Sequence, residues 1–371
     1  MCVVFCVLFF CIFSMTEEVS HLEVSRLLTK AVQMRAAVLH LQPGALPLLR
    51  VDGELRSITD EQVVTLELVM GFLDVLASAT HKEQLDRDRQ IIFSKELENR
   101  QRIIVQVEHE RGRLVITIRF VDQHIFTFEQ LRVPPAVLNV IQQGRGLMII
   151  SGPHDSGKSS LIASIVETVN ANASKRIVMI ESPIERVFIN KKSLIEQREV
   201  GIDVPSWAAG ARSVKETDVD MLVLGGCIDG DQLKEAVMLG EGDLLVIMVI
   251  EALSVLHALD ILHGYLSPEE QVSWRLALAR ATSAIVNLRL VPRIGGGRMP
   301  IYEVYVRNTL GQAAIGSGHF VQLENVIQSS SQDGMQTLNG ALATVVRSGE
   351  VTPENALQES TAPDQLKALF R

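Results

Sequence analysis

The sequence is poor in aromatic side chains, in cysteines outside its first residues and in positive charge. Phe, Trp and Tyr make up 5% of the 371 residues, and the formal net charge is -9. Binding to nucleic-acid phosphates needs a basic surface, so this charge balance argues against a nucleic-acid partner. Three cysteines lie within the first fourteen residues, and Cys227 is the only other one. A single cysteine cannot build a disulfide framework, which indicates a cytoplasmic protein.

The opening segment MCVVFCVLFFCIFS, residues 1–14, is nearly all apolar. It is shorter than the roughly 20 residues that a transmembrane helix needs, and it lacks the positive start of a secretory signal. Met15 begins a stretch typical of a soluble amphipathic helix. Three interpretations stay open: a wrongly chosen start codon, a membrane-associating anchor and a degenerate signal. Residues 1–14 are left out of the fold prediction.

Length and pattern predict an α/β protein with two domains. Residues 15–121 mix helix and strand patterns: helices over 19–36 and 60–76, a hairpin turn at Asp52-Gly53, and antiparallel strands over 102–107 and 114–120 joined by the turn ERG. This indicates a small α+β domain, and residues 122–128 are expected to form a linker.

Residues 129–371 alternate short apolar runs with helical patterns, as in a largely parallel sheet buried on both faces. The expected strands are GLMIIS, RIVMIES, DMLVLGG and DLLVIMVI, with a helix over Lys158–Val169 and a hairpin in RIGGGRMPIYEVYV beyond Pro292. The end is expected to be helical from Gly334, with Thr352-Pro353 as the cap and first turn of the last helix.

The stretch SGPHDSGKSSL, Ser151–Leu161, satisfies G-x-x-x-x-G-K-[ST] at every fixed position. Such a loop points several backbone N–H groups at one centre, where phosphate oxygens bind. Lys158 is expected to reach the β- and γ-phosphates, and the Ser159 hydroxyl to ligate Mg²⁺. The predicted ligand is therefore ATP with Mg²⁺, and the alternative is a glycine-rich turn that binds nothing. The predicted nucleotide-binding residues are Gly152, Pro153, His154, Asp155, Ser156, Gly157, Lys158, Ser159 and Ser160.

Further short motifs accompany this loop: LRVDGELRSI, IESPIERV, QREVG, ARS, IGGGR and GMQTLNGAL. With them, the chain from Met15 to Leu357 resembles the hexameric motor ATPases that retract type IV pili, the PilT/PilU type of the secretion-ATPase superfamily. The resemblance implies a PAS-like domain over 15–121, a RecA-like P-loop ATPase core with a helical carboxy-terminal part over 129–371, and a six-membered ring. It also implies phosphate-contacting arginines in the amino-terminal domain. Arg102, Arg111 and Arg119 are the candidates, and exposed strand arginines are the alternative.

Three motifs of that family are altered in this chain. Gly226 stands where the family has the Walker B glutamate, which orients the attacking water. Ile250 stands where the family has the histidine that senses the γ-phosphate, and Glu251 stands at the following threonine. The segment LGQAAIGS, Leu310–Ser317, keeps none of the charges of a two-arginine helix that retraction needs. Ile228 replaces a further arginine.

Intact binding with altered catalysis predicts a nucleotide-binding pseudo-motor of the twitching-motility machinery. It would be a hydrolysis-impaired paralogue that joins or regulates an active hexameric motor. The alternative is an active but slow retraction ATPase that uses compensating carboxylates, for which Glu181 and Glu185 are the catalytic candidates and Glu251 a further one. The expected partners are ATP or ADP, a homo-hexamer or a mixed ring with an active PilT-like ATPase, and the inner-membrane platform protein of the pilus. The expected location is cytoplasmic, peripheral to the inner membrane at the pilus base.

Overall fold

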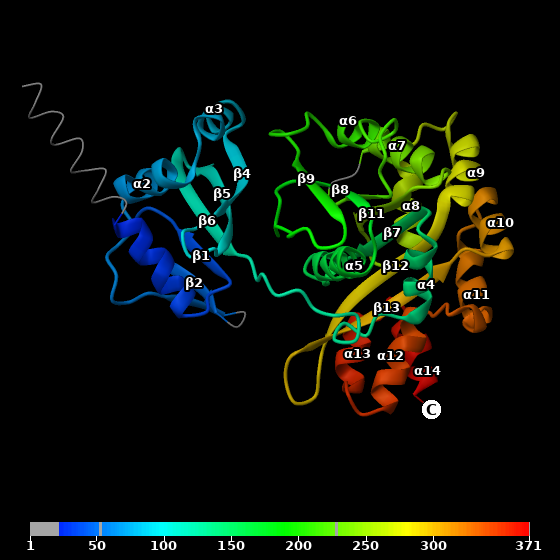
Figure 1. The fold of residues 1–371 in the computed structure, drawn as a ribbon. Coiled ribbons are helices and arrows are strands. Elements are labelled where there is room, and N and C mark those ends of the chain that lie inside the picture. Colours follow the sequence, from blue (N-terminus) through cyan, green and yellow to red (C-terminus); the bar gives the residue numbers. More distant parts are fainter. Residues whose placement is uncertain (1–21, 52–53, 227–228, 371) are drawn as a thin grey trace, which may run out of the picture. The chain divides into compact units, whose positions relative to one another are not determined.

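The computed structural model describes residues 22–51, 54–226 and 229–370. They form two compact units: the described residues up to His124 with Pro183–Arg186, and Ile125–Ser182 with the residues from Val187 on (Figure 1). The change of unit between His124 and Ile125 falls within the segment expected to be a linker. Four predictions lie outside the described residues: those on 1–14, on the turn Asp52-Gly53, on Cys227 and on Ile228.

The first unit is built on a six-stranded antiparallel sheet of order β3-β2-β1-β6-β5-β4. The strands are β1 Val38–Leu41, β2 Leu48–Val51, β3 Glu54–Ser57, β4 Gln90–Glu96, β5 Arg102–Glu110 and β6 Arg113–Phe120. The helical elements are residues 22–33, α2 Leu66–Leu76 and α3 Ala79–Asp88. Both predicted strand pairs, β2 with β3 and β5 with β6, are confirmed.

Two parts of the first unit differ from the prediction. The helix expected from residue 60 begins at Leu66, because the Thr65 side chain accepts a hydrogen bond from the Leu68 N–H at 3.1 Å and caps the first turn. Helix α3 and strand β4 were not predicted. Leu85 is the one buried residue that is described in α3, so its sequence has almost no apolar periodicity.

The second unit is built on a seven-stranded sheet of order β13-β12-β7-β11-β10-β8-β9. The strands are β7 Gly146–Gly152, β8 Arg176–Glu181, β9 Leu194–Glu199, β10 Met221–Leu224, β11 Leu245–Glu251, β12 Thr282–Pro292 and β13 Arg298–Val306. All neighbours pair in parallel except β12 and β13, which form an antiparallel hairpin. The four predicted strands are β7, β8, β10 and β11. The predicted hairpin segment supplies the turn and β13, whereas its first strand, β12, precedes it.

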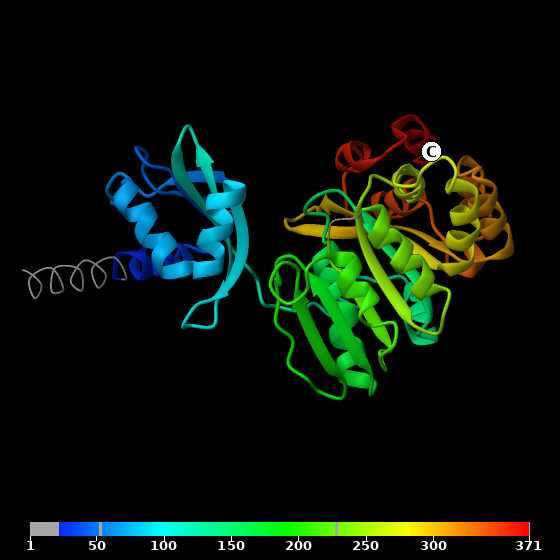
Figure 2. The same ribbon diagram turned by 90° about the horizontal axis from the view of Figure 1, so that it is seen from above.

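Helices cover both faces of this sheet (Figures 1 and 2). One face packs against α4 Pro135–Gln143 and α5 Lys158–Asn172. The other packs against α6 Trp207–Arg212, α7 Gly230–Gly240, α8 Val255–Gly264, α9 Gln271–Ala281, α10 Thr309–Ser317 and α11 Val321–Ser329. This two-sided burial explains why β7, β10 and β11 read as continuous apolar runs.

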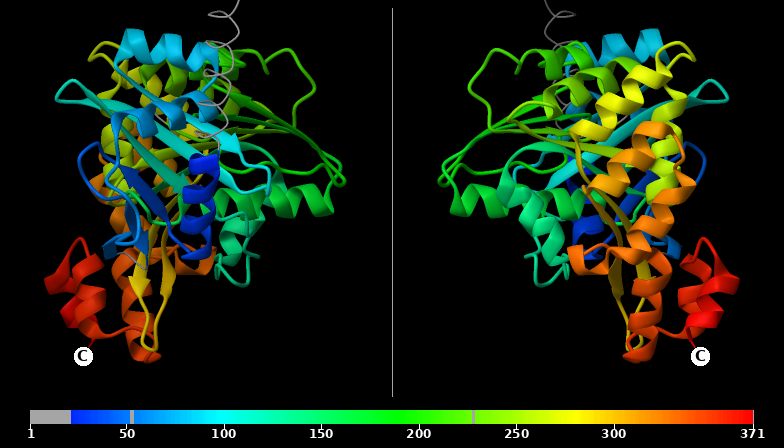
Figure 3. Two further views of the ribbon diagram at one scale, coloured as in Figure 1. Left: turned by 90° about the vertical axis from the view of Figure 1, so that its left-hand side faces the viewer. Right: turned by 90° about the vertical axis from the view of Figure 1, so that its right-hand side faces the viewer.

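The carboxy-terminal helices pack on the outer part of the β12–β13 hairpin (Figure 3). They are α12 Leu338–Arg347, α13 Pro353–Glu359 and α14 Pro363–Leu369, preceded by the short 3-10 helix η1 Ser331–Asp333. The predicted cap is confirmed: the Thr352 hydroxyl accepts a hydrogen bond from the Asn355 N–H at 3.2 Å, and Pro353 opens α13. The expectation that this is the last helix is wrong, because α14 follows it and begins at a proline of its own, Pro363. Among the helices that the structure describes, none is both long enough and apolar enough to cross a bilayer.

Candidate nucleotide-binding site

The loop that the motif predicts to bind phosphate, called the phosphate-binding loop below, joins the buried strand β7, which ends at Gly152, to helix α5, which begins at Lys158. A Cβ atom at Gly152 would lie 2.7 Å from the carbonyl oxygen of Leu288, so only glycine fits this close approach. The Ser156 hydroxyl is buried and has no hydrogen-bond partner among the described residues. A tight turn with an unsatisfied buried hydroxyl fits a loop that closes around an anion.

Lys158 lies over this loop. Its Nζ donates hydrogen bonds to the carbonyl oxygens of Gly152 at 3.0 Å and Pro153 at 2.7 Å. Burial lowers the pKa of the Lys158 ammonium, and the negative charges of Glu251 and Asp155 act in the opposite direction. The ammonium therefore lies at the loop, where lysines of this motif contact phosphates.

Ser159 and Ser160 follow in the first turn of α5, Ser159 exposed and Ser160 half-buried. No group of three or more His, Cys, Asp or Glu side chains suited to a metal ion occurs within residues 22–51, 54–226 and 229–370. A Mg²⁺ ion at this loop would therefore depend on the Ser159 hydroxyl and on phosphate oxygens, as in other P-loop proteins. The bound ion would neutralise phosphate charge.

Strand β11 lies beside β7 and brings the altered sensor positions to the loop. In the parallel register, Ile250 is level with Ser151 and Glu251 with Gly152. The Ile250 side chain is buried in the apolar core. The Glu251 side chain is 67% exposed, and its Oε1 lies 3.5 Å from Nδ1 of His154. This edge of the sheet thus presents an apolar side chain and a carboxylate where the resemblance implies a histidine and a threonine.

Strand β10 is followed by Gly225 and Gly226. A Cβ atom at Gly226 would lie 2.8 Å from both Cζ2 and Cη2 of Trp207, closer than carbon atoms pack. Trp207 is the first residue of α6, and its side chain is buried in the core. The indole therefore fills the space that any side chain at position 226 would need.

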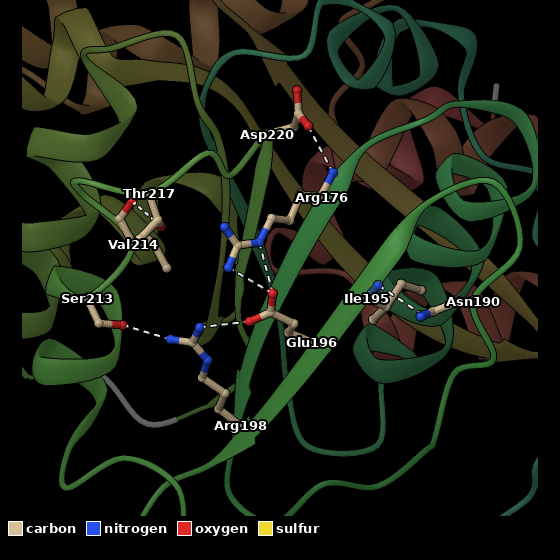
Figure 4. A network of polar contacts seen from close by, with 9 residues as sticks. All are labelled: Arg176, Asn190, Ile195, Glu196, Arg198, Ser213, Val214, Thr217 and Asp220. Carbon is tan, nitrogen blue, oxygen red and sulfur yellow. Dashed lines mark hydrogen bonds and ion pairs between the residues drawn. The ribbon is translucent and has the colours of Figure 1, made fainter.

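A polar network fixes helix α6, which carries Trp207 (Figure 4). The Arg176 Nε donates to one carboxylate oxygen of Glu196 at 2.9 Å, and the Arg198 Nη2 donates to the other at 2.8 Å. The Arg198 Nη1 donates to the Ser213 hydroxyl at 2.9 Å, at the carboxyl end of α6. Hydrogen bonds from Arg176 and Arg198 lower the pKa of Glu196. Arg198 belongs to QREVG and Ser213 to ARS, two of the motifs on which the resemblance rests. Their hydrogen bond holds α6 against strands β8 and β9.

The two catalytic candidates lie in different units. Glu181 ends β8, where its Oε1 accepts a hydrogen bond from the Gln197 side chain at 3.0 Å. Its Cγ would lie 3.2 Å from a Cβ atom at Gly225, so Glu181 is next to the end of β10. Glu185 belongs to the first unit, and its carboxylate forms an ion pair with Arg119 at 2.7 Å.

The three candidate arginines do not share one place in the first unit. Arg102 and Arg119 lie near the same end of the β5–β6 hairpin, since Ile104 pairs with Arg119. Arg111 lies in the turn at the opposite end. Nine residues of extended strand separate Arg102 from Arg111, which corresponds to roughly 30 Å. Arg111 of one subunit therefore cannot contact the same phosphate group as its own Arg102 and Arg119.

Two residues of the candidate site were not found from the sequence. One is Trp207, described above. The other is Asn287 on β12, which is buried and whose Nδ2 donates to the Ser151 hydroxyl at 2.9 Å and to the Ala252 carbonyl at 3.0 Å. Asn287 thereby connects the base of the phosphate-binding loop with the chain that follows β11. Both contacts join residues far apart in sequence, so no local pattern indicates them.

Known proteins resemble this chain along most of its length. Residues 16–295 match the model of the family described as type II/IV secretion system protein. The chain is 27% identical over 346 residues to the type IV pilus retraction ATPase PilT of Pseudomonas aeruginosa, covering 92% of this chain and 99% of that protein. It is 25% identical to the type IV pilus ATPase PilU of the same organism, covering 94% and 92%.

A crystal structure of the pilus retraction motor PilT with bound ADP superposes with a TM-score of 0.83 and 29% sequence identity, covering 92% of this chain and 98% of that one. The predicted fold class, α/β with a RecA-like ATPase core, is thereby confirmed. The chain belongs to the type II/IV secretion system protein family and is of the PilT type.

Proposed function

We propose that this chain is an ATP-binding subunit of a type IV pilus retraction machinery whose own hydrolysis is impaired. In this proposal it joins or regulates an active hexameric motor, either as a homo-hexamer or within a mixed ring. It would act in the cytoplasm, peripheral to the inner membrane, at the platform protein of the pilus base. The similarity to PilT and PilU along nearly the whole chain supports the machinery.

Nucleotide binding rests on the intact loop. The turn at Gly152, the buried Ser156 hydroxyl and the Lys158 ammonium supply what the motif requires for a phosphate chain. None of these features depends on the altered positions 226 and 250. Binding can therefore persist where hydrolysis does not.

The observation that carries the impairment is the contact between Gly226 and Trp207. A glutamate at position 226 would polarise the attacking water, but the indole fills the space next to this backbone. Ile250, which is buried, supplies no polar group either. One positioned acid–base group typically contributes about 10²- to 10⁴-fold to a rate, so the loss of both groups removes most of the chemical catalysis.

Helix α10 supports impaired force transmission. It contains the segment Leu310–Ser317, where the resemblance implies two functional arginines. Its exposed positions are uncharged, and Leu310 is 63% exposed. An uncharged face cannot form the ion pairs that an arginine helix would offer to a partner.

A second candidate is an active, slow retraction ATPase, and the position of Glu181 favours it. This carboxylate lies next to Gly225, at the edge of the sheet where the Walker B glutamate is expected. If Glu181 orients water in place of residue 226, turnover would persist, and Glu181→Gln would abolish it.

The two candidates are separated by measuring ATP binding and steady-state ATP hydrolysis on the full chain with Mg²⁺, with Lys158→Ala as the control. The proposal expects binding that depends on Lys158, and no hydrolysis above this control. Mixing with an intact PilT-type ATPase tests the mixed ring, by co-purification and by a change in the hydrolysis rate of the intact enzyme. Hydrolysis that depends on Lys158 in the isolated chain would establish the second candidate instead.

A further inference from the structure

One ammonium group and two carboxylates lie at the phosphate-binding loop. Within the loop the formal charges belong to Asp155 and Lys158. Glu251, from the adjacent strand, adds a second carboxylate. Two carboxylates therefore act on one ammonium group.

Glu251 is held in this place by the backbone around it. Its strand register with Gly152 is fixed by parallel pairing. The N–H of the next residue, Ala252, donates a hydrogen bond to the Gly152 carbonyl at 3.3 Å, and the Ala252 carbonyl accepts one from the Asn287 Nδ2 at 3.0 Å. The backbone of Glu251 is therefore fixed beside Gly152, and the side chain starts from this position.

The carboxylate also acts on loop residues. Its Oε1 lies 3.5 Å from Nδ1 of His154, whose Nε2 lies 3.6 Å from Oδ1 of Asp155. The charges of Glu251 and Asp155 both act on the Lys158 ammonium. Lysine in this motif contacts the β- and γ-phosphates, so a carboxylate near it offsets part of the attraction for phosphate charge.

We propose that Glu251 makes this loop bind a nucleoside diphosphate more tightly than a nucleoside triphosphate. This rests on the proposed function, because it requires that the loop bind nucleotide. A triphosphate brings one more charged group to the lysine than a diphosphate does, and Glu251 repels that group most. Solvent screens the repulsion in part because the side chain is largely exposed, so the expected effect is moderate.

The test is equilibrium titration of the full chain with Mg²⁺ and either ADP or ATP, at an ionic strength of about 0.15 M. The wild-type chain should bind ADP about threefold more tightly than ATP, which corresponds to about 0.7 kcal/mol and is in the range of exposed charge pairs. Glu251→Gln keeps the shape of the side chain and removes its charge. It should tighten ATP binding about threefold and leave ADP binding nearly unchanged.

Asp243→Asn is the matched control. It removes one negative charge just before β11, whereas Glu251 ends that strand, so the two positions are roughly 25 Å apart. This variant should leave the ratio of ATP to ADP affinity unchanged. Thermal melting of both variants checks that they fold as the wild-type chain does.

Equal affinities for ADP and ATP in the wild-type chain would overturn the inference and leave the proposed function standing. The same conclusion follows if Glu251→Gln leaves the ratio unchanged. Weaker ATP binding by Glu251→Gln would also overturn it, because the carboxylate would then be holding the metal ion of the nucleotide. If neither nucleotide binds any better to the wild-type chain than to Lys158→Ala, the proposed function fails together with the inference.

Discussion

The contact between Gly226 and Trp207 predicts a measurable energetic coupling between these two positions. Gly226→Ala adds one Cβ atom, which would lie 2.8 Å from Cζ2 and Cη2 of the indole. Carbon atoms prefer about 3.5–4.0 Å, so the indole or the backbone has to shift. Overpacking of this kind typically costs about 1–3 kcal/mol of unfolding free energy, and we expect that loss for Gly226→Ala.

Trp207→Phe provides the matched background because phenylalanine lacks Cζ2 and Cη2. In that background Gly226→Ala should cost less than about 1 kcal/mol, which gives a coupling energy of about 1–2 kcal/mol in the double-mutant cycle. The assay is urea unfolding of the four proteins followed by tryptophan fluorescence. Trp274 is present in all four, and both tryptophans belong to the second unit, so the signal reports that unit alone.

Additive effects would refute the reasoning. If the cost of Gly226→Ala is the same in both backgrounds within about 0.5 kcal/mol, the indole does not occupy the space next to residue 226. A wild-type stability in Gly226→Ala itself would lead to the same conclusion. The steric argument against restoring a side chain at position 226 would then fail, although Gly226 itself would still supply no carboxylate.

Three other predictions follow from the same structure. Gly226→Glu alone should not produce Mg²⁺-dependent ATP turnover, because the carboxylate meets the Trp207 indole; turnover in this single variant would contradict the steric argument. Burial raises the pKa of the Glu303 carboxyl from its ordinary 4.5 to about 7, so the folded state binds this proton more tightly than the unfolded state does. The contribution of the protonated Glu303 carboxyl to the unfolding free energy should thus be fully present below about pH 4.5 and be lost as the pH rises towards about 7. Glu303→Gln can keep the 2.8 Å hydrogen bond from the Val255 N–H and does not titrate. Its urea midpoint should therefore lack the part of the decrease between about pH 4.5 and about 7 that Glu303 causes. Arg198→Ala should lower the unfolding free energy by about 1–2 kcal/mol, because it removes hydrogen bonds to Glu196 and Ser213; an unchanged urea midpoint would show that the network does not hold α6.

The sequence allowed the second unit to be predicted better than the first. Strands β7 and β11 are buried on both faces and are continuous apolar runs, a pattern that needs no tertiary information. The phosphate-binding loop is a local motif, so its place between β7 and α5 was also predictable. Helix α3 was missed because it packs through little more than Leu85.

The rest of the site depends on contacts between distant parts of the chain. Nothing local to Trp207 indicates that its indole covers Gly226, and nothing local to Asn287 indicates a bond to Ser151. The separation of Arg102 from Arg111, by contrast, follows from the predicted hairpin itself, because its first strand begins at Arg102 and Arg111 lies in its turn. Strand pairing and helix packing decide these neighbours, and both are long-range.

The altered positions at the edge of the second sheet are packed and not left as voids. The indole covers Gly226, Ile250 is part of the core, and helix α6 is held by the Arg198 network. Protein interiors are close-packed, so a side chain restored at one of these positions has to displace its neighbours. The phosphate-binding loop, by contrast, keeps every fixed residue of its motif, so no side chain has to be restored there. This arrangement favours a site specialised to hold nucleotide over one that has merely lost single catalytic groups, because simple loss would have left space for them.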